Sequence, residues 1–547
     1  MGKIFSSKWI KKMINNKPII IVGAGLAGLT AAAYLSRKGE KVVLVEKNDE
    51  CGGLLNSFEY QDFTFDVGAR SIENSGVIKP MLKDLGIDIE LLNSKVSIGI
   101  ESDIFPFTSL KDIDAYKKLL KVKFINNTKD IDKIFKVINK ITKSMKIMYG
   151  FDNPIFTKDF TKNKKYLIHE LLPWFPKFLY TIMQMNRMNQ PIDEFLQKYT
   201  KNQSLIDMIS QHFFKKTPTF FALGYFYVYQ DYIYPKGGTG ELSKKLYANL
   251  INNGVKIINN TTINAIHPNK KTLIDQNNNS YEYSKLIWAS DLSNFYSILN
   301  ISKLDKKTKT KTLKEKEKIS NSRGGDSVFS LYLGVNLEKE YFSAISNGHF
   351  FYTPKKEGLN NIHYKKLNYL INNFESLSKS DILNWVYKYC ELNTYEISIP
   401  ILRDSNLAPK GKTGVIANIF FEYDLVKKIE KAGWYNEFKT LVENKIIEIL
   451  NNSVYKNLKE NILFKFSFTP ISIENRVKTA QGAITGWTYE KPSPVVNNII
   501  KMPKSIKTPI NDIYQVGQWA YSPAGIPTAI ISGWYAADNI IKNIKKE

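Results

Sequence analysis

The sequence has few of the residues that build disulfide frameworks or metal clusters, and it has no long apolar run. Its 547 residues include two cysteines, Cys51 and Cys390, which lie far apart and form no CxxC pair. A disulfide scaffold and a cysteine metal cluster are therefore excluded, and a reducing compartment is expected. Glycines interrupt the apolar stretch that begins at Ile19. We expect neither a membrane-spanning helix nor a secretory signal, and hence a cytoplasmic protein.

Arginine is also scarce. Basic residues number 77 against 52 acidic ones and give a formal net charge of +25. Nearly all of this excess is lysine, because the arginines are Arg37, Arg70, Arg187, Arg323, Arg403 and Arg476. Lysine lacks the planar fork with which arginine binds phosphate and guanine. We expect no nucleic-acid partner and interpret the charge as compositional bias, with weak attraction to an anionic membrane as the alternative.

Residues 18–46 carry the strongest local pattern in a chain whose composition, 43% hydrophobic and 24% charged, is typical of a globular protein. An apolar run that ends at Val22 is followed by Gly23, Gly25 and Gly28, a helical pattern, and a second apolar run that ends at Glu46. This order of strand, glycine turn, helix, strand and acidic residue is typical of a dinucleotide-binding fold.

Each residue of this turn has a predicted role. Gly23 permits the tight turn, Gly25 lets a pyrophosphate approach the backbone, and Gly28 allows close packing of the helix. Leu26 and Ala27 begin that helix, whose free N–H groups face the phosphates. Glu46, which Lys47 follows, is predicted to accept hydrogen bonds from ribose hydroxyls, and this favours FAD or NAD over NADP.

A second motif decides between the two cofactors. Residues 51–54 read Cys-Gly-Gly-Leu, and residues 63–70 read Phe-Thr-Phe-Asp-Val-Gly-Ala-Arg. This segment resembles the FAD-dependent amine oxidase and phytoene desaturase superfamily, and the resemblance implies FAD, with contacts from Gly52, Gly53, Leu54, Gly68, Ala69 and Arg70. Many members have arginine where this chain has Leu54. The phosphate contact is therefore expected from backbone N–H groups or from Asn56.

The substrate class is suggested by residues 234–240, which read Tyr-Pro-Lys-Gly-Gly-Thr-Gly. This box is similar to that of phytoene desaturases, carotene isomerases and retinol saturases. Residues 399–411 resemble the same branch. The resemblance implies a long apolar substrate of polyene or isoprenoid type.

The C-terminal region resembles the closing FAD motif of the same superfamily. A strand pattern from Ile513 runs into Gly517 and Gln518, and Gly525, Ile526 and Pro527 open a helix. A helix N-terminus aimed at the flavin would stabilise the negative charge of its reduced form. The predicted cofactor-binding residues are Gly23, Gly25, Leu26, Ala27, Gly28, Glu46, Lys47, Gly52, Gly53, Leu54, Gly68, Ala69, Arg70, Gly517, Gln518, Gly525, Ile526 and Pro527.

The middle of the chain leaves alternatives open. The apolar segment 171–180 is predicted to be a membrane-dipping lip or an ordinary buried helix. Aromatic residues between Phe213 and Tyr234 are predicted to line a substrate tunnel or to fill a core. His212 is expected to be structural rather than a base. The lysine-rich segment 303–318 is expected to be a solvated surface.

These patterns predict an α/β fold: a Rossmann-like FAD-binding domain of the glutathione-reductase type with an inserted mixed α+β substrate domain. The basic leader covers residues 1–16. The FAD-binding domain is discontinuous and comprises residues 17–100, 231–300 and 500–547. The substrate-binding domain comprises residues 101–230, which include a helical cap, and residues 301–499.

The predicted function is FAD-dependent desaturation, saturation or isomerisation of carbon–carbon bonds in a long apolar substrate. An FAD-dependent amine oxidase and a non-catalytic flavin-binding protein at a membrane surface are the alternatives. Arg70 and Tyr234 are the candidate catalytic residues, because each adjoins a motif expected to approach the flavin. No metal is expected. Only one dinucleotide fingerprint is present, so oxygen, a quinone or another molecule is expected to accept the electrons, and peripheral membrane contact is left open.

Overall fold

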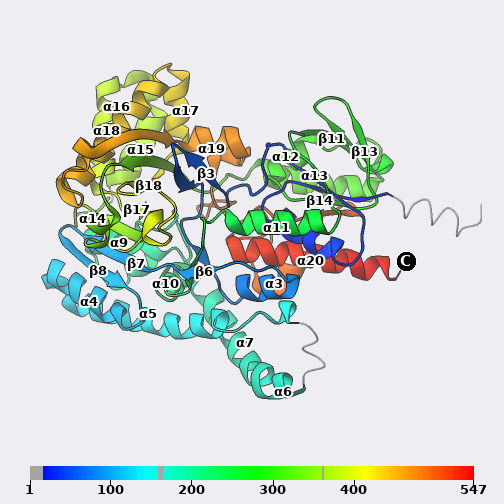
Figure 1. Ribbon diagram of the computed structural model, residues 1–547, viewed down its shortest axis with the longest axis horizontal. Coiled ribbons are helices and arrows are strands. Elements are labelled where there is room, and N and C mark those ends of the chain that lie inside the picture. The colour runs from blue at the N-terminus through cyan, green and yellow to red at the C-terminus, as the bar shows by residue number, and fades with distance from the viewer. Residues whose placement is uncertain (1–16, 158–163, 360–361, 547) are drawn as a thin grey trace, which may run out of the picture.

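The computed structural model describes residues 17–157, 164–359 and 362–546, and the predicted basic leader lies outside these ranges. Figure 1 shows two lobes, one around α2, α11 and α20 and the other around α14 to α18. Among the described residues, no helix has both the length and the apolar character needed to cross a membrane.

The first lobe is built on a parallel five-stranded sheet with the strand order β10-β2-β1-β14-β20. Its strands are β1 (Ile19–Val22), β2 (Val42–Val45), β10 (Lys256–Ile258), β14 (Leu286–Trp288) and β20 (Ile513–Gln515). The first two strands are apolar at every position and fully buried, as expected for a parallel sheet covered on both faces. Segments distant in the sequence therefore meet in one sheet.

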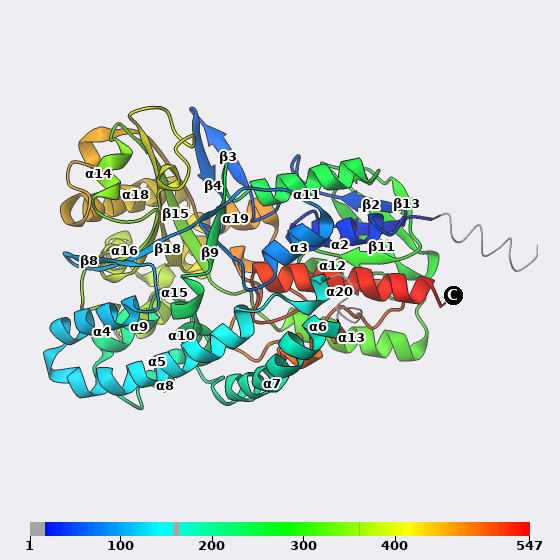
Figure 2. The same ribbon diagram turned by 60° about the horizontal axis from the view of Figure 1, so that its bottom comes forward.

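Helices α2 (Leu26–Ser36), α11 (Glu241–Asn252) and α20 (Ile526–Ile544) pack on this sheet. Every residue of α2 is buried, because α11 and α20 both pack against it (Figure 2). A small antiparallel sheet of β11 (Ile263–His267), β12 (Thr272–Asp275) and β13 (Ser280–Glu282) extends this lobe. The lysine-rich segment expected to be solvated forms the helix α13 (Lys306–Ser320), whose N-terminus is capped by the Asp305 side chain.

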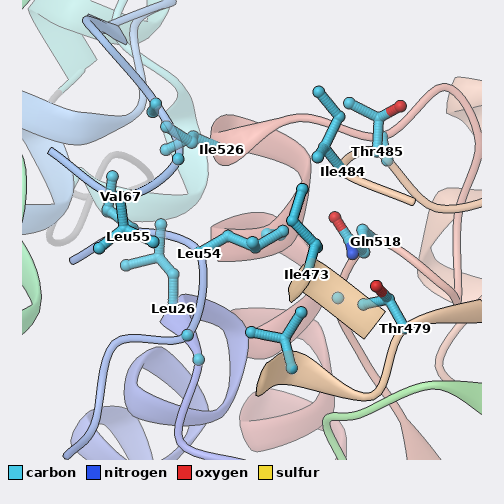
Figure 3. Close-up of a pocket in the computed structure, with 18 of the residues that line it drawn as sticks. Leu26, Leu54, Leu55, Val67, Ile473, Thr479, Ile484, Thr485, Gln518 and Ile526 are labelled. Atoms are coloured by element: carbon cyan, nitrogen blue, oxygen red, sulfur yellow. The ribbon is translucent and has the colours of Figure 1, made fainter. Parts of the chain in front are cut away.

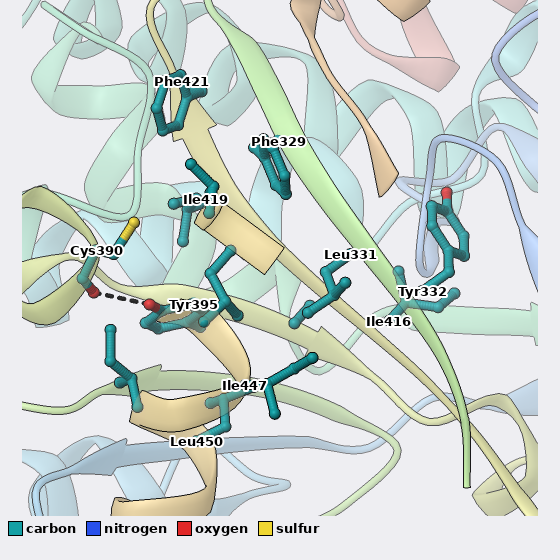
Figure 4. Close-up of a cluster of buried hydrophobic side chains, with 14 of the residues drawn as sticks. Phe329, Leu331, Tyr332, Cys390, Tyr395, Ile416, Ile419, Phe421, Ile447 and Leu450 are labelled. Atoms are coloured by element: carbon teal, nitrogen blue, oxygen red, sulfur yellow. Dashed lines mark hydrogen bonds between the residues drawn. The ribbon is translucent and has the colours of Figure 1, made fainter. Parts of the chain in front are cut away.

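The second lobe is built on a seven-stranded sheet with the order β19-β15-β18-β17-β16-β7-β8. Its strands are β7 (Val96–Ile100), β8 (Asp103–Phe107), β15 (Ser327–Val335), β16 (His349–Thr353), β17 (Tyr395–Ser398), β18 (Thr413–Phe421) and β19 (Ile462–Phe468). Helices on one face are α14 (Lys339–Ser343), α15 (Ile362–Asn372), α16 (Lys379–Leu392), α17 (Tyr423–Lys431) and α18 (Tyr435–Ser453). Figure 4 shows part of their shared core, in which the Tyr395 hydroxyl donates to the carbonyl of Cys390 at 2.7 Å.

Strand β7 corrects one predicted domain boundary. It pairs in parallel with β16 and antiparallel with β8, so residues 96–100 belong to the seven-stranded sheet. The boundary predicted at residue 100 therefore falls too late in the sequence. The chain crosses between the lobes in a short sheet of β5 (Ile72–Glu73), β9 (Tyr232–Pro235) and β6 (Leu91–Asn93), and in the hairpin of β3 (Ser57–Tyr60) and β4 (Phe63–Asp66).

A helical layer completes the second lobe. Its helices are α4 (Asp112–Lys123), α5 (Thr128–Tyr149), α6 (Lys164–Tyr166), α7 (Leu172–Arg187), α8 (Ile192–Leu196), α9 (Gln203–Ser210) and α10 (Thr219–Val228). Helices α4, α5 and α10 share a core with the sheet edge. Helix α7 extends away from the body of the molecule in Figure 1, and its Trp174 Nε1 donates to the Ile147 carbonyl of α5 at 2.7 Å. The remaining helices are α3 (Ile78–Leu85), α12 (Leu292–Ile298) and α19 (Pro470–Val477).

Candidate functional site

A cavity of about 850 Å³ lies between the lobes and is lined by both ends of the chain. This volume is near the upper end of the roughly 300–1,000 Å³ typical of ligand sites. Figure 3 shows Leu54, Ile473 and Gln518 beside the same space, although they come from distant segments. The predicted residues that line the cavity are Gly23, Gly25, Leu26, Ala27, Glu46, Lys47, Gly52, Gly53, Leu54, Gly68, Ala69, Arg70, Gly517, Gln518, Gly525 and Ile526.

The glycine turn after β1 is closed on one side and open on the other. A Cβ atom on Gly23, whose φ is +103°, would lie 2.8 Å from the carbonyl oxygen of Ala289. One on Gly28 would lie 2.0 Å from the Gly23 oxygen. A Cβ on Gly25 would meet no atom within 4 Å, because it would enter the cavity. Gly28 thus packs the helix and Gly25 leaves room for a ligand, the arrangement required for a pyrophosphate.

Glu46 holds this turn as well as lining the cavity. One carboxylate oxygen accepts from the backbone N–H of Ala24 at 2.8 Å and the other from that of Asn48 at 3.0 Å. The predicted hydrogen bond to a ribose stays a prediction. The structure adds polar neighbours that no sequence motif indicated, namely Thr261, Thr262, Asn264 and Ser290.

The second motif continues the wall beside the first. Gly52 has a φ of +124°, and its N–H donates to the Ala24 carbonyl at 2.8 Å. A Cβ on Gly68 would lie 2.2 Å from the Leu54 oxygen, so these two segments are in backbone contact. Asn56 does not line the cavity among the described residues, because its side chain bonds to Ser57 N–H and neighbouring groups. The expectation that Asn56 contacts a phosphate is therefore wrong.

The C-terminal motif reaches the same cavity from the other side. The N–H of Gly517, whose φ is +92°, donates to the Ser532 hydroxyl at 2.9 Å, which fixes the turn after β20. Gly525 precedes the first turn of α20 and lines the cavity, whereas Pro527, within that turn, is buried and does not line it. Pro527 is thus a helix-starting residue rather than a ligand contact.

Of the two candidate catalytic residues, one lines the cavity and the other does not. Arg70 is only 2% exposed and lines the cavity, where its guanidinium donates to the Asp66 carbonyl and, at 3.0 Å, to Asn418 Oδ1. Tyr234 is fully buried, donates to Asp66 Oδ2 at 2.9 Å and lies under the Arg403 guanidinium. Because Tyr234 does not line the cavity, its predicted place in the pocket is wrong, and it supports the Asp66 loop instead.

A charged cluster that sequence reasoning missed faces the cavity beside Arg70. The Glu396 carboxylate bonds to His349 Nε2 at 3.0 Å and accepts from Asn418 Nδ2 at 3.0 Å. Burial alone would raise the pKa of Glu396. The hydrogen bond with His349, together with the charge of Arg70, outweighs burial and lowers that pKa to about 2. Glu396 is therefore ionised at neutral pH.

Aromatic residues form the rest of the wall. They include Phe213, Phe214, Phe221, Tyr225, Tyr229, Tyr232 and Phe351. Phe220 and Phe226 lie instead in the helical core, so the predicted cluster is divided between a ligand wall and a core. His212 also lines the cavity, and burial lowers its pKa to about 3, which makes it a weak base at neutral pH.

The sequence of the chain is similar to those of known proteins. Residues 21–85 match the family model described as an NAD(P)-binding Rossmann-like domain. A 4,4'-diapophytoene desaturase of Staphylococcus haemolyticus is 22% identical over 96% of this chain and 99% of its own. The all-trans-retinol 13,14-reductase of Danio rerio is 22% identical over 91% of this chain and 82% of its own.

Solved structures share the fold along nearly the whole chain. A putrescine oxidase variant has a TM-score of 0.58 at 12% identity and covers 96% of this chain and 99% of its own. A reduced UDP-galactopyranose mutase has a TM-score of 0.55 at 15% identity, with 96% of each chain covered. Over most of its length the chain is thus similar to a diapophytoene desaturase and a retinol 13,14-reductase, and it shares its fold with flavin-type oxidoreductases. The predicted Rossmann-like α/β fold is confirmed.

The predicted cofactor, FAD, fits the residues present. The open face of Gly25 and the free N-terminus of α2 suit a pyrophosphate, and polar groups around Glu46 suit an adenosine. The turn at Gly517 and the start of α20 suit a flavin ring. Among the described residues, no group of three or more His, Cys, Asp or Glu side chains could hold a metal ion.

Proposed function

We propose that the protein is an FAD-dependent oxidoreductase that desaturates, saturates or isomerises a carbon–carbon bond in a long polyene or isoprenoid-like substrate. One observation carries the proposal: the glycine turns expected to hold FAD and a wall of aromatic side chains line the same cavity. The names of the desaturase and the retinol reductase to which the chain is similar support the substrate class.

The chain's own residues have separable tasks in this reaction. When bound, FAD supplies hydride transfer. Gly25, Glu46 and Gly517 would hold the cofactor, and the rings of Tyr225, Tyr229 and their neighbours would orient an apolar chain and exclude water. Arg70 holds the Asp66 loop against the seven-stranded sheet through Asn418 and keeps a positive charge beside the cavity.

The test is an anaerobic half-reaction. The purified holoprotein, in one series with its flavin oxidised and in a second with its flavin reduced by dithionite, is mixed with an acyclic polyene, with its fully saturated analogue and with a diamine, while the visible absorbance of the flavin is followed. Products are separated by chromatography, because isomerisation leaves the flavin oxidised. Conversion of the polyene alone supports the proposal. Conversion of the diamine alone would contradict it, and no conversion of any of them would indicate a flavin-binding protein without turnover.

An amine oxidase is the second candidate, because one observation favours it. The ionised carboxylate of Glu396 lines the cavity, and a carboxylate there is a suitable partner for an ammonium group. The aromatic wall favours the polyene, since a small amine would leave most of it unfilled. Release of hydrogen peroxide with amines but not with polyenes would favour the amine oxidase.

Contact with a membrane surface belongs to the proposal, because a polyene partitions into lipid. Helix α7 exposes large apolar side chains at Leu172 (57% exposed), Phe175 (50%), Tyr180 (51%) and Met183 (52%), with Lys177 beside them. The prediction of an ordinary buried helix is therefore wrong for this face. Such a surface is typical of helices that lie in the headgroup region of a bilayer.

Sedimentation with vesicles of anionic lipid tests this contact. Phe175→Ser together with Tyr180→Ser is expected to reduce binding severalfold. Val122→Ser together with Ile125→Ser removes exposed apolar groups from the region of α4 and is the matched control. If both double variants lose vesicle binding equally, or if neither loses any, a specific contact through α7 is contradicted.

A further inference from the structure

Glu73 is a carboxylate that the cavity contains and that no motif indicated. It is the last residue of β5, where it pairs with Tyr232 of β9, and its side chain lines the cavity. A Cβ atom on Gly525 would lie 2.9 Å from Glu73 Oε1. The carboxylate therefore lies beside the residue that opens α20, at the end of the cavity expected to hold the flavin ring.

The surroundings of Glu73 leave its carboxylate unneutralised. Within the residues described, no hydrogen bond or ion pair reaches it, whereas Glu396 has His349 and Asn418. The titratable groups that face Glu73 are Asp231, Tyr149, Tyr225, Tyr232 and Tyr489, and none of them is a cation. Burial, with a smaller contribution from the charge of Asp231, raises the pKa of Glu73 to about 7.

We propose that Glu73 is a catalytic residue that exchanges a proton with the substrate carbon next to the one that exchanges hydride with FAD. This inference rests on the proposed function. In desaturation, one carbon gives a hydride to FAD, the neighbouring carbon gives its proton to the Glu73 carboxylate, and the electron pair of that C–H bond becomes the new double bond. Saturation by reduced FAD reverses each step, with protonated Glu73 as the donor.

The other ionisable groups of the cavity are poorer candidates for this step. His212 is too weak a base, with its pKa lowered to about 3 by burial. Both oxygens of Glu396 are hydrogen-bonded, and its pKa of about 2 makes it a weak base. Arg70 is engaged with Asp66 and Asn418. A group that exchanges protons near neutral pH is best matched to general acid–base work, and Glu73 has that property.

The first test compares the wild type with Glu73→Gln, and with Glu59→Gln as a control, because Glu59 is an exposed glutamate on β3. Conversion of a polyene by the holoprotein is measured from pH 5 to pH 9. Glu73→Gln is expected to keep its bound FAD, to lose turnover by about 100-fold or more, and to lose the pH-dependent limb near pH 7. Glu73→Asp is expected to keep that limb. An unchanged pH profile in Glu73→Gln would overturn the proposal.

The second test needs no substrate. A pKa raised from 4.5 to about 7 in the folded state costs stability as pH rises between these values. Glu73→Gln removes this cost, so the variant should melt at a higher temperature than the wild type. The difference between the two melting temperatures should grow from pH 5 to pH 7 and stay constant above pH 7. A pH-independent difference would overturn the proposal even if the wild type converts polyenes. If the melting temperatures show that Glu73 titrates near pH 7 but the protein converts no polyene, the proposed function and the proton-transfer role are both refuted. The raised pKa of Glu73 would still stand.

Discussion

The backbones of Gly533 and Ala27 are in contact. A Cβ atom on Gly533 would lie 2.5 Å from the carbonyl oxygen of Ala27, so helices α20 and α2 pack without a side chain between them. These helices come from opposite ends of the chain, and each begins at a glycine that lines the cavity, Gly25 or Gly525. The cofactor site therefore depends on this packing.

Gly533→Val should separate the two helices. The larger side chain overpacks the contact, and we expect a loss of about 1–3 kcal/mol in the free energy of unfolding, together with weaker retention of flavin. Asn539→Val, at a partly exposed position of the same helix, is the control for helix propensity. Equal melting temperatures and equal flavin content for the two variants would show that the contact is unimportant.

Gly25→Ala should weaken FAD binding, whereas Gly28→Ala should weaken folding. A methyl group at residue 25 meets no atom, and the φ of −72° suits alanine, so folding should be unaffected. We expect FAD affinity to fall roughly tenfold or more, or about 1.4 kcal/mol, because the methyl occupies ligand space. At residue 28 the methyl meets the Gly23 oxygen at 2.0 Å, so folding itself should suffer. Calorimetric titration of the apoprotein with FAD and thermal melts measure the two effects, and loss of stability in Gly25→Ala would contradict the assignment.

Glu396→Gln should show a characteristic dependence on pH. The native pKa of Glu396, lowered to about 2, means that the ionised carboxylate stabilises the fold above pH 4.5 and that this stabilisation is lost as pH falls toward 2. The variant should therefore be less stable than the wild type at pH 7, on the order of 1 kcal/mol after allowance for screening in the cavity. Denaturant unfolding should show a smaller difference in the free energy of unfolding between the two proteins at pH 3 than at pH 7. A larger difference at pH 3 would contradict this prediction.

Both thiols should be unreactive in the native protein. Burial raises the pKa of Cys51 and of Cys390 to about 12, with Glu46 and Glu50 adding to the effect at Cys51. Since the thiolate is the reactive form, alkylation at neutral pH should be roughly a hundredfold or more slower than in the denatured chain. Mass spectrometry of labelled protein checks this, and rapid labelling of native Cys51 would contradict it.

The sequence was informative where chemistry depends on local backbone shape. Gly23, Gly25 and Gly28 are positioned within one turn, so their spacing alone indicates a dinucleotide site. Strands β15 and β18 are also legible in the sequence, because strands that are buried along nearly their whole length consist mostly of apolar residues.

The sequence was uninformative where the site is assembled by tertiary contacts. Glu396 and His349 meet through the pairing of β17 with β16, and neither lies in a motif. Tyr234 was misplaced because adjacency to a glycine box does not tell which side of β9 faces the cavity. Glu73 shows the same limit, since its proposed role depends on its position in the cavity and on the lack of a bonding partner among the described residues, and both are visible only in the folded chain.

The most direct test of the central claim is the identity and amount of the cofactor released from the purified protein. The two-ended cavity predicts FAD, at one molecule per chain, with retention reduced in both Gly25→Ala and Gly533→Val. A protein that carries no flavin and binds none when FAD is added would contradict it.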